Sequence, residues 1–275
     1  MAKRRIKKGK VVKVLFILLI VIGIIGYGLY YFGIIGKDDI KKIKEPELKI
    51  LDMNSNSRPY AVMIDNVAQA RPHSGLDKAY LVYEVIVEGN LTRLMAVFRD
   101  VDVSEIGPVR SARPYFIDYA LENDVIYVHH GRSPQAKAQL KEYDVDDLEG
   151  LYNPAGMFWR DNNRYAPHNS YTSTDGIKDG IEKEEYRDTS KKSDWLLLKY
   201  SARPIDLSEK EGAISANKVV VNFSSSVYAT FEYNKEENKY YRFQNGNKHM
   251  DRKGFQYTSK NIIVLTGIRN YTIDS

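Results

Sequence analysis

Two arginines that flank a serine precede a predicted helix. The segment GPVRSAR places Arg110, Ser111 and Arg113 just before a helix expected to start near Pro114. The N–H groups and dipole at a helix start favour an anion, and a guanidinium can hold a carboxylate or phosphate through two parallel hydrogen bonds. The segment HHGRSP repeats this arrangement with Ser133 at the next helix start. The sequence therefore predicts an anion-binding site.

Two glutamates offer a second kind of chemistry. Glu84 and Glu88 interrupt the apolar run AYLVYEVIVEGNLTRLMAVFRD, which also contains Arg93. Glycoside hydrolysis usually needs two carboxyl groups ~5–10 Å apart, whereas four residues along a strand separate these two by ~13 Å. They form a poor catalytic pair, although either glutamate, or His130, is a candidate for a lone acid or base. The alternative is that the GPVRSAR arginines form structural salt bridges with the glutamates.

Serine–histidine and metal chemistry leave weaker signals. Ser111 or Ser133 could pair with a histidine, but the chain has no G-x-S-x-G motif. His130, His168 and a carboxylate could ligate a metal, but no HExxH-like spacing exists, and a lone histidine is more often structural. The absence of cysteine excludes disulfides, thiol catalysis and Cys-ligated metal sites. We therefore predict no metal and no cofactor, and the sequence leaves enzymatic activity open.

A hairpin must position the glutamates. Gly89–Asn90 predicts a two-residue turn between its strands. In that register Ile86 would face Arg93. Because side chains alternate along a strand, one face of the hairpin would then carry Glu84, Ile86, Glu88, Leu91, Arg93 and Met95.

The rest of this module mixes strands and loops. RPYAVMIDN predicts a buried strand that ends at Asp65 and Asn66, and VIYVHHG predicts a strand that runs into a turn at Gly131. A long loop-rich stretch follows, and its polar candidates for ligand binding are Arg160, Arg164, His168 and Asn169.

Serines mark the expected helix starts. Ser111 is the expected N-cap of the first helix, and Ser133, followed by Pro134, is that of the second. Ser173 or Thr174 should cap a third, short helix.

The C-terminal part alternates strongly between apolar and polar residues. ANKVVVNFSS, VYATFEYNKEENKYYRFQNG and GFQYTSKNIIVLTG predict antiparallel strands joined by turns such as Asn245–Gly246. We therefore predict an α+β fold, with a mixed α/β first module at residues 58–190 and a mainly antiparallel β second module at residues 191–275.

A transmembrane anchor is expected at the N-terminus. Residues 1–13 carry seven cations and no acid, and residues 14–35 are apolar and uncharged. Such a span covers ~33 Å as a helix, enough for a ~30 Å hydrocarbon core. The positive-inside rule places the basic tail in the cytoplasm. The linker 36–57 would then lead to modules on the outer face of the cell membrane, on a single-pass anchor.

The basic net charge comes from that tail. Beyond residue 36 the chain has 34 Lys and Arg against 36 Asp and Glu, so its net charge is −2 instead of the +5 of the whole sequence. A weakly acidic domain does not attract a polyphosphate backbone. We therefore predict no nucleic-acid partner.

Several motifs in fixed order resemble the YerB-like family of bacterial envelope proteins, which are often lipoproteins. They include RPYAVMIDN, VYEVIVEGNLTRLMAVF, IGPVRSARPYFIDYA, VHHGRSPQA and FWRDNNRYAPHNSYTS. The resemblance implies two modules and an extracytoplasmic location in Gram-positive-type bacteria, but no activity. It also implies that the second module is incomplete in this chain. The residues that match the family pattern are Asp65, Asn66, Glu84, Glu88, Arg93, Arg110, Ser111, Arg113, His130, Ser133, Arg160, Arg164, Pro167, His168 and Asn169.

Our leading functional hypothesis is a cell-envelope protein that binds an envelope component, such as peptidoglycan, or a partner protein. The binding cleft would be formed by the Arg, Glu and His side chains of the first module. The alternatives are a peptidoglycan or glycan hydrolase or lyase that uses Glu84 or Glu88, and a non-catalytic scaffold for membrane proteins.

Overall fold

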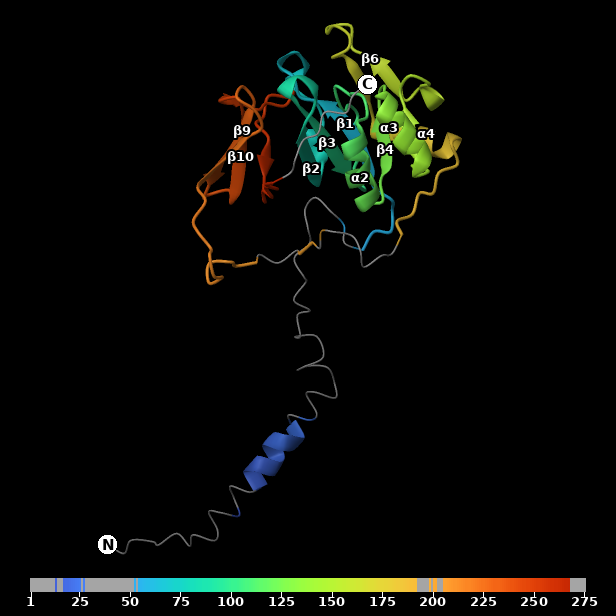
Figure 1. Ribbon diagram of the computed structural model, residues 1–275. Coiled ribbons are helices and arrows are strands. Elements are labelled where there is room, and N and C mark those ends of the chain that lie inside the picture. Colours follow the sequence, from blue (N-terminus) through green and yellow to red (C-terminus); the bar gives the residue numbers. More distant parts are fainter. Residues whose placement is uncertain are drawn as a thin grey trace, which may run out of the picture. The chain divides into compact units, whose positions relative to one another are not determined.

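A mixed five-stranded sheet organises the first module (Figure 1). The computed structural model describes residues 13, 17–25, 27, 52, 54–191, 198, 200–201 and 205–267, and its contacts define two units, Met1–Glu47 and Leu48–Ser275. The strands are β1 (Tyr60–Asp65), β2 (Leu81–Ile86), β3 (Thr92–Phe98), β4 (Ile126–His129) and β5 (Asp147–Glu149). Their order is β2-β3-β1-β4-β5, with β1 antiparallel to β3 and parallel to β4. The predicted mixed character of this module is confirmed.

The central strand β1 is buried along its whole length. Val62 and Ile64 belong to the core on one face of the sheet, and Ala61 and Met63 belong to the core on the other. A strand buried on both faces reads as a continuous apolar run, which explains the sequence YAVMID. β1 therefore fixes the position of its polar end, Asp65, between two packed layers.

Helices cover both faces of the sheet, and they are α2 (Pro114–Glu122), α3 (Pro134–Glu142) and α4 (Thr174–Lys183). Phe116 of α2 and Leu140 of α3 pack into the core that contains Met63, whereas Ile177 of α4 packs into the opposite core. The smaller elements are the paired strands β6 (Phe158–Arg160) and β7 (Ser170–Thr172), and the 3-10 turns η1 (Ala68–Ala70), η2 (Leu76–Lys78), η3 (Glu88–Asn90) and η4 (Pro154–Gly156).

The predicted caps are right for two of these helices. Ser133 Oγ accepts the N–H of Ala136 at 3.1 Å at the start of α3, and Ser173 caps α4 in the same way. The prediction that Ser111 caps α2 is wrong. The N-cap is Arg113, because the chain remains extended up to that residue (φ −134°, ψ 148°), and Arg113 makes no capping hydrogen bond through its side chain.

Replacing Ser133 with alanine should lower the free energy of unfolding by about 1 kcal/mol, because the N–H of Ala136 loses its acceptor. Urea denaturation followed by circular dichroism measures this loss. Ser111→Ala is the matched control and should change stability by less than about 0.5 kcal/mol. Equal losses for the two variants would contradict the capping role.

The hairpin register differs by one residue from the prediction. Val85, instead of Ile86, lies opposite Arg93. The reason is the turn, in which a three-residue 3-10 segment, Glu88–Asn90, replaces the predicted two-residue turn. A slip of one residue moves side chains to the other face of a sheet. Glu84 and Arg93 therefore lie on opposite faces, and the prediction of one shared face is wrong.

The second module contains an antiparallel sheet of order β11-β10-β9-β8, with β12 also paired to β10. Its strands are β8 (Lys218–Asn222), β9 (Tyr228–Asn234), β10 (Lys239–Gln244), β11 (Asn247–Lys248) and β12 (Thr258–Ser259). The turn between β10 and β11 is Asn245–Gly246, and both residues have positive φ (49° and 77°). The predicted α+β class and the antiparallel second sheet are confirmed.

The predicted anchor is described only in part. Residues 17–25 are helical, and their side chains are exposed. Within the described ranges, no helix combines the length and the apolar character needed to cross a membrane. The other residues of 14–35 except Tyr27, most of the tail 1–13 and most of the linker 36–57 lie outside the described residues. Residues 268–275, at the end predicted to be incomplete, also lie outside them.

Candidate functional site

Asp65, at the end of the central strand, is held by groups from three segments. Arg110 approaches its carboxylate with Nε 3.1 Å from Oδ2, and His168 Nδ1 lies 2.6 Å from the same oxygen. His73 Nε2 lies 2.5 Å from the backbone oxygen of Asp65. The segment that carries Arg110 reaches this point because its backbone pairs with the end of β1 through the N–H of Arg110 and the carbonyl of Met63.

A cavity of about 360 Å³ opens beside Asp65. Arg93, Arg110 and Arg113 line it together with two carboxylates, Asp65 and Glu88. The two arginines of the GPVRSAR segment and the arginine of the hairpin therefore converge, as the predicted anion site requires.

The arginines of this cavity repel one another. Arg93 is buried and donates from Nη1 to the carbonyl of Ser111 at 2.5 Å. Burial, followed by the charges of Arg113 and Arg110, lowers the pKa of Arg93 to about 10. The guanidinium remains protonated at neutral pH, so the cavity carries three positive charges against two negative ones.

The two glutamates occupy different environments. Glu88 is exposed and pairs with Arg113 Nε at 2.5 Å, and hydrogen bonding and charge from Arg113 outweigh partial burial to lower its pKa. Glu84 lines neither of the two cavities described for this structure. It pairs with Arg242 of the second module at 2.7 Å. The alternative that the GPVRSAR arginines form salt bridges with the glutamates therefore holds for Arg113, which pairs with Glu88. Arg110 pairs with Asp65 instead of a glutamate, and Glu84 pairs with Arg242.

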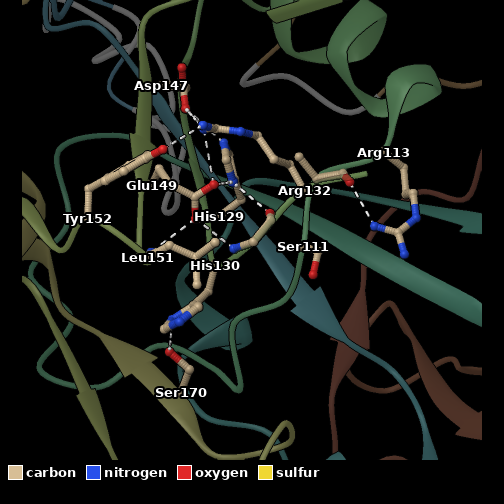
Figure 2. Close-up of polar contacts among 12 residues, drawn as sticks. Ser111, Arg113, His129, His130, Arg132, Asp147, Glu149, Leu151, Tyr152 and Ser170 are labelled. Carbon is tan, nitrogen blue, oxygen red and sulfur yellow. Dashed lines mark hydrogen bonds and ion pairs between the residues drawn. The ribbon is translucent and has the colours of Figure 1, made fainter. Parts of the chain in front are cut away.

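His130 belongs to a separate polar cluster (Figure 2). Its Nδ1 lies 2.7 Å from Ser170 Oγ, and its Nε2 lies 3.1 Å from Arg160. Because a guanidinium only donates, Nε2 must accept and Nδ1–H must donate to Ser170. Burial, followed by the charge of Arg160, lowers the pKa of His130. In this state His130 cannot take a proton from the buried Ser170 through Nδ1, so the pair is not arranged as a nucleophile and base.

Next to it, His129 lies in a buried ionic cluster (Figure 2). Its Nε2 is 2.9 Å from Asp147, and its Nδ1 is 2.9 Å from the carbonyl of Gly131. Glu149 accepts the N–H of Gly131 at 2.6 Å and pairs with Arg132 at 3.1 Å. These contacts tie β4, β5 and the start of α3 together, so the cluster has a structural explanation.

Histidines that sequence reasoning did not select form a chain of hydrogen bonds between the modules. Arg242 Nη1 donates to His249 Nδ1, so His249 Nε2–H must donate to His73 Nδ1, 2.7 Å away. His73 Nε2–H then donates to the backbone oxygen of Asp65. Burial lowers the pKa of His73 to about 3 and that of His249 well below its usual range, which agrees with two neutral rings.

Both modules match a known family. The family model described as "Protein of unknown function (DUF3048) N-terminal domain" matches residues 47–187, and its "C-terminal domain" counterpart matches residues 219–275. The chain belongs to the DUF3048 family. It is 36% identical over 231 residues to "Putative lipoprotein YerB" of Bacillus subtilis (strain 168), across 83% of this chain and 68% of that protein.

The fold of this DUF3048 chain resembles a solved structure. The crystal structure of YerB protein from Bacillus subtilis matches it with a TM-score of 0.61 and 32% sequence identity. The match covers 75% of this chain and 69% of that chain. The resemblance to the YerB-like family is thereby confirmed.

The polar network around Arg242 joins the two DUF3048 domains. Glu84 and His73 lie in the N-terminal domain, and Arg242 and His249 lie in the C-terminal domain. A signal was present in the sequence, because Arg242 interrupts the apolar strand KYYRFQ as Glu84 interrupts its own strand. Each strand pattern thus indicates a charge that needs a partner, but it does not identify that partner.

The remaining predicted ligand-binding residues of the DUF3048 N-terminal domain shape its loops. Arg164 donates to the carbonyl of Pro72 at 2.7 Å, and Asn169 accepts from Arg160 at 2.9 Å and donates to the carbonyl of Asp161. Ser133 is a helix cap. None of these lines the arginine cavity. Among the residues that the structure describes, no group of three or more His, Asp or Glu side chains could hold a metal ion.

Proposed function

We propose that this DUF3048 protein is a cell-envelope binding protein that holds a carboxylate or phosphate group in its arginine cavity. The observation that carries the proposal is the convergence of Arg93, Arg110 and Arg113 on one cavity with only two carboxylates. Arg110 Nε lies 3.1 Å from Asp65 Oδ2 but is a buried atom without a hydrogen bond among the described residues, so the fold does not use up the hydrogen-bonding capacity of this guanidinium. An anion there would reduce the repulsion among the guanidiniums.

The proposed location is the outer face of a cell membrane, with residues 14–35 as the anchor. The basic flank at residues 1–13 and the uncharged run that follows support this topology. The name of the Bacillus subtilis relative, which describes a lipoprotein, is consistent with attachment to a membrane.

The geometry supports binding better than glycan hydrolysis. Glu84 accepts hydrogen bonds from Asn66, Thr92 and Arg242, and its side chain is 11% exposed. A general acid must reach the leaving-group oxygen of the substrate, whereas Glu84 is enclosed by its partners. Glu88 is accessible, but no second carboxylate lines the cavity except Asp65, which already binds Arg110 and His168.

The variant Arg110→Gln/Arg113→Gln should bind cell-wall material roughly tenfold or more weakly, because each change removes charge-assisted hydrogen bonds to the anion. Co-sedimentation of the full chain in detergent with purified peptidoglycan sacculi measures the affinity. Sacculi treated to remove their phosphate polymers separate a carboxylate ligand from a phosphate ligand.

Lys218→Gln/Lys239→Gln is the matched control, since it also removes two positive charges but from exposed positions on the second module. It should bind like the wild type. Unchanged binding by the double arginine variant, with both forms of sacculi, would show that the cavity is not the binding site.

A further inference from the structure

A second cavity, of about 320 Å³, adjoins the arginine cavity. Val67, Leu91 and Thr92 line both cavities, so these residues mark where one ends and the other begins. The arginine cavity is built by the N-terminal domain alone. The second cavity is completed by the C-terminal domain, which contributes Ser226, Val227, Gln244 and Asn245.

The two cavities differ in chemistry. Four residues with side-chain amides, Asn66, Gln69, Gln244 and Asn245, line the second together with one cation, Arg71. The amide of Gln244 is already bonded within the protein, which leaves Asn66, Gln69 and the amide nitrogen of Asn245 as the candidates for a ligand. No acidic or aromatic residue belongs to its described lining. A side-chain amide offers one acceptor and two donors, so it complements a peptide group, which offers one donor and one acceptor. The lining provides no aromatic ring on which the apolar face of a sugar could stack.

Asn66 provides an independent sign of a missing partner. It is 4% exposed, and its Oδ1 is a buried atom without a hydrogen bond among the described residues. Its Nδ2 donates to Glu84, Thr92 and Gln244. These are acceptors, so the amide cannot be flipped without placing its oxygen against the Glu84 carboxylate. A buried acceptor left without a donor is destabilising, and a ligand N–H would satisfy it.

We infer that the two cavities form one groove that binds an acidic peptide with a free carboxyl end. The inference rests on the proposed anion site and names its ligand class. The arginine cavity holds the terminal carboxylate. The amide-lined cavity receives the adjoining peptide groups, one of which donates to Asn66, and Arg71 faces an acidic side chain. Because the C-terminal domain completes the groove, both DUF3048 domains are needed to hold the peptide, whereas a carboxylate alone needs only the first.

Isothermal titration calorimetry on the full chain in detergent tests this inference with defined probes. These are acetyl-Glu-Ala-Ala, its C-terminal amide, acetyl-alanine measured by displacement, and a hyaluronan tetrasaccharide as an acidic glycan. The free peptide should bind about tenfold tighter than either acetyl-alanine or the amide. Arg113→Gln should weaken the binding of both acetyl-alanine and the peptide.

The decisive variant is Ser226→Trp, because Ser226 is exposed, lines the second cavity and takes no part in the hydrogen bonds of Glu84 with Asn66 and Arg242. Ser226→Trp should abolish the difference in affinity between the peptide and acetyl-alanine and leave the affinity for acetyl-alanine unchanged. Gln69→Ala should likewise lower the affinity for the peptide but not that for acetyl-alanine. Thermal melting confirms that both variants fold.

Each contrary result has a distinct meaning. Acetyl-alanine binding that depends on Arg113 supports the anion site. If the peptide then binds no tighter than acetyl-alanine, or if Ser226→Trp leaves the affinity for the peptide unchanged, the groove is refuted. Tighter binding of the tetrasaccharide than of the peptide overturns the peptide in favour of an acidic glycan. If neither acetyl-alanine nor the peptide binds, the groove and the carboxylate site both fail.

Discussion

The Glu84→Ala variant is expected to lose about 3–5 kcal/mol of unfolding free energy, because removing one partner of a buried ion pair leaves the other charge uncompensated. Glu84 and Arg242 lie 2.7 Å apart, and each side chain is only 11% exposed. Glu84 also accepts hydrogen bonds from Asn66 and Thr92. Truncation therefore leaves a cation and two donors without their acceptor, at the contact that joins the two modules.

Urea denaturation with tryptophan fluorescence and circular dichroism measures this loss. Glu232→Ala is the control, because Glu232 pairs with Lys218 on the exposed face of the second sheet, and exposed pairs contribute about 0–1 kcal/mol. A Glu84→Ala protein of wild-type stability would contradict the structural role. If such a stable variant had also lost a measurable glycan-cleaving activity, Glu84 would be a catalytic acid after all.

Acidification is expected to destabilise the folded protein through His73 and His249. The folded-state pKa of His73 is lowered to about 3 by burial, below the ~6.5 of an unfolded histidine. Between these values the unfolded chain binds a proton that the folded chain does not, so stability falls as the pH drops below about 6.5. At about pH 5 His73 alone accounts for a loss of roughly 2 kcal/mol, and His249 acts in the same direction.

Unfolding free energies measured between about pH 7.5 and pH 5 test this expectation, since most carboxylates remain ionised over that range. Nuclear magnetic resonance of the imidazole protons reports the protonation of each histidine ring separately. The resonances of His73 and His249 should not shift between these pH values in the folded protein. Titration of either ring near pH 6.5 would refute the neutral chain of hydrogen bonds from Arg242 to Asp65.

The sequence pattern is sufficient to predict a structural element where interactions between neighbouring residues determine that element. Ser133 followed by Pro134 gave the start of α3, and the run YAVMID gave the central strand, because capping and burial act through neighbouring residues. The convergence of Arg110 and Arg113 on one site was also predictable, since they lie three residues apart in one segment. These features need no knowledge of distant contacts.

Prediction failed where the structure depends on one residue of turn length or on distant partners. A third turn residue at Glu88 moved Glu84 to the face opposite Arg93. The pairing of Glu84 with Arg242 joins positions 158 residues apart, and neither residue's neighbours indicate the other. Periodicity shows that a charge lies in an apolar strand, but only the packing of the two modules shows what neutralises it.

The order of the two modules along the chain also matters for how the protein folds. The five-stranded sheet is complete at Glu149 and its last helix ends at Lys183, before β8 begins at Lys218. Domains generally fold as units during synthesis, the N-terminal one first. In the proposed topology the first module can therefore fold on the outer face of the membrane while its docking surface, with the polar Glu84, Asn66 and His73, is still without a partner. Water can hydrate these polar groups until the second module docks, whereas Leu76 and Ala79 still lack Tyr257 of the second module, which belongs to the same hydrophobic core.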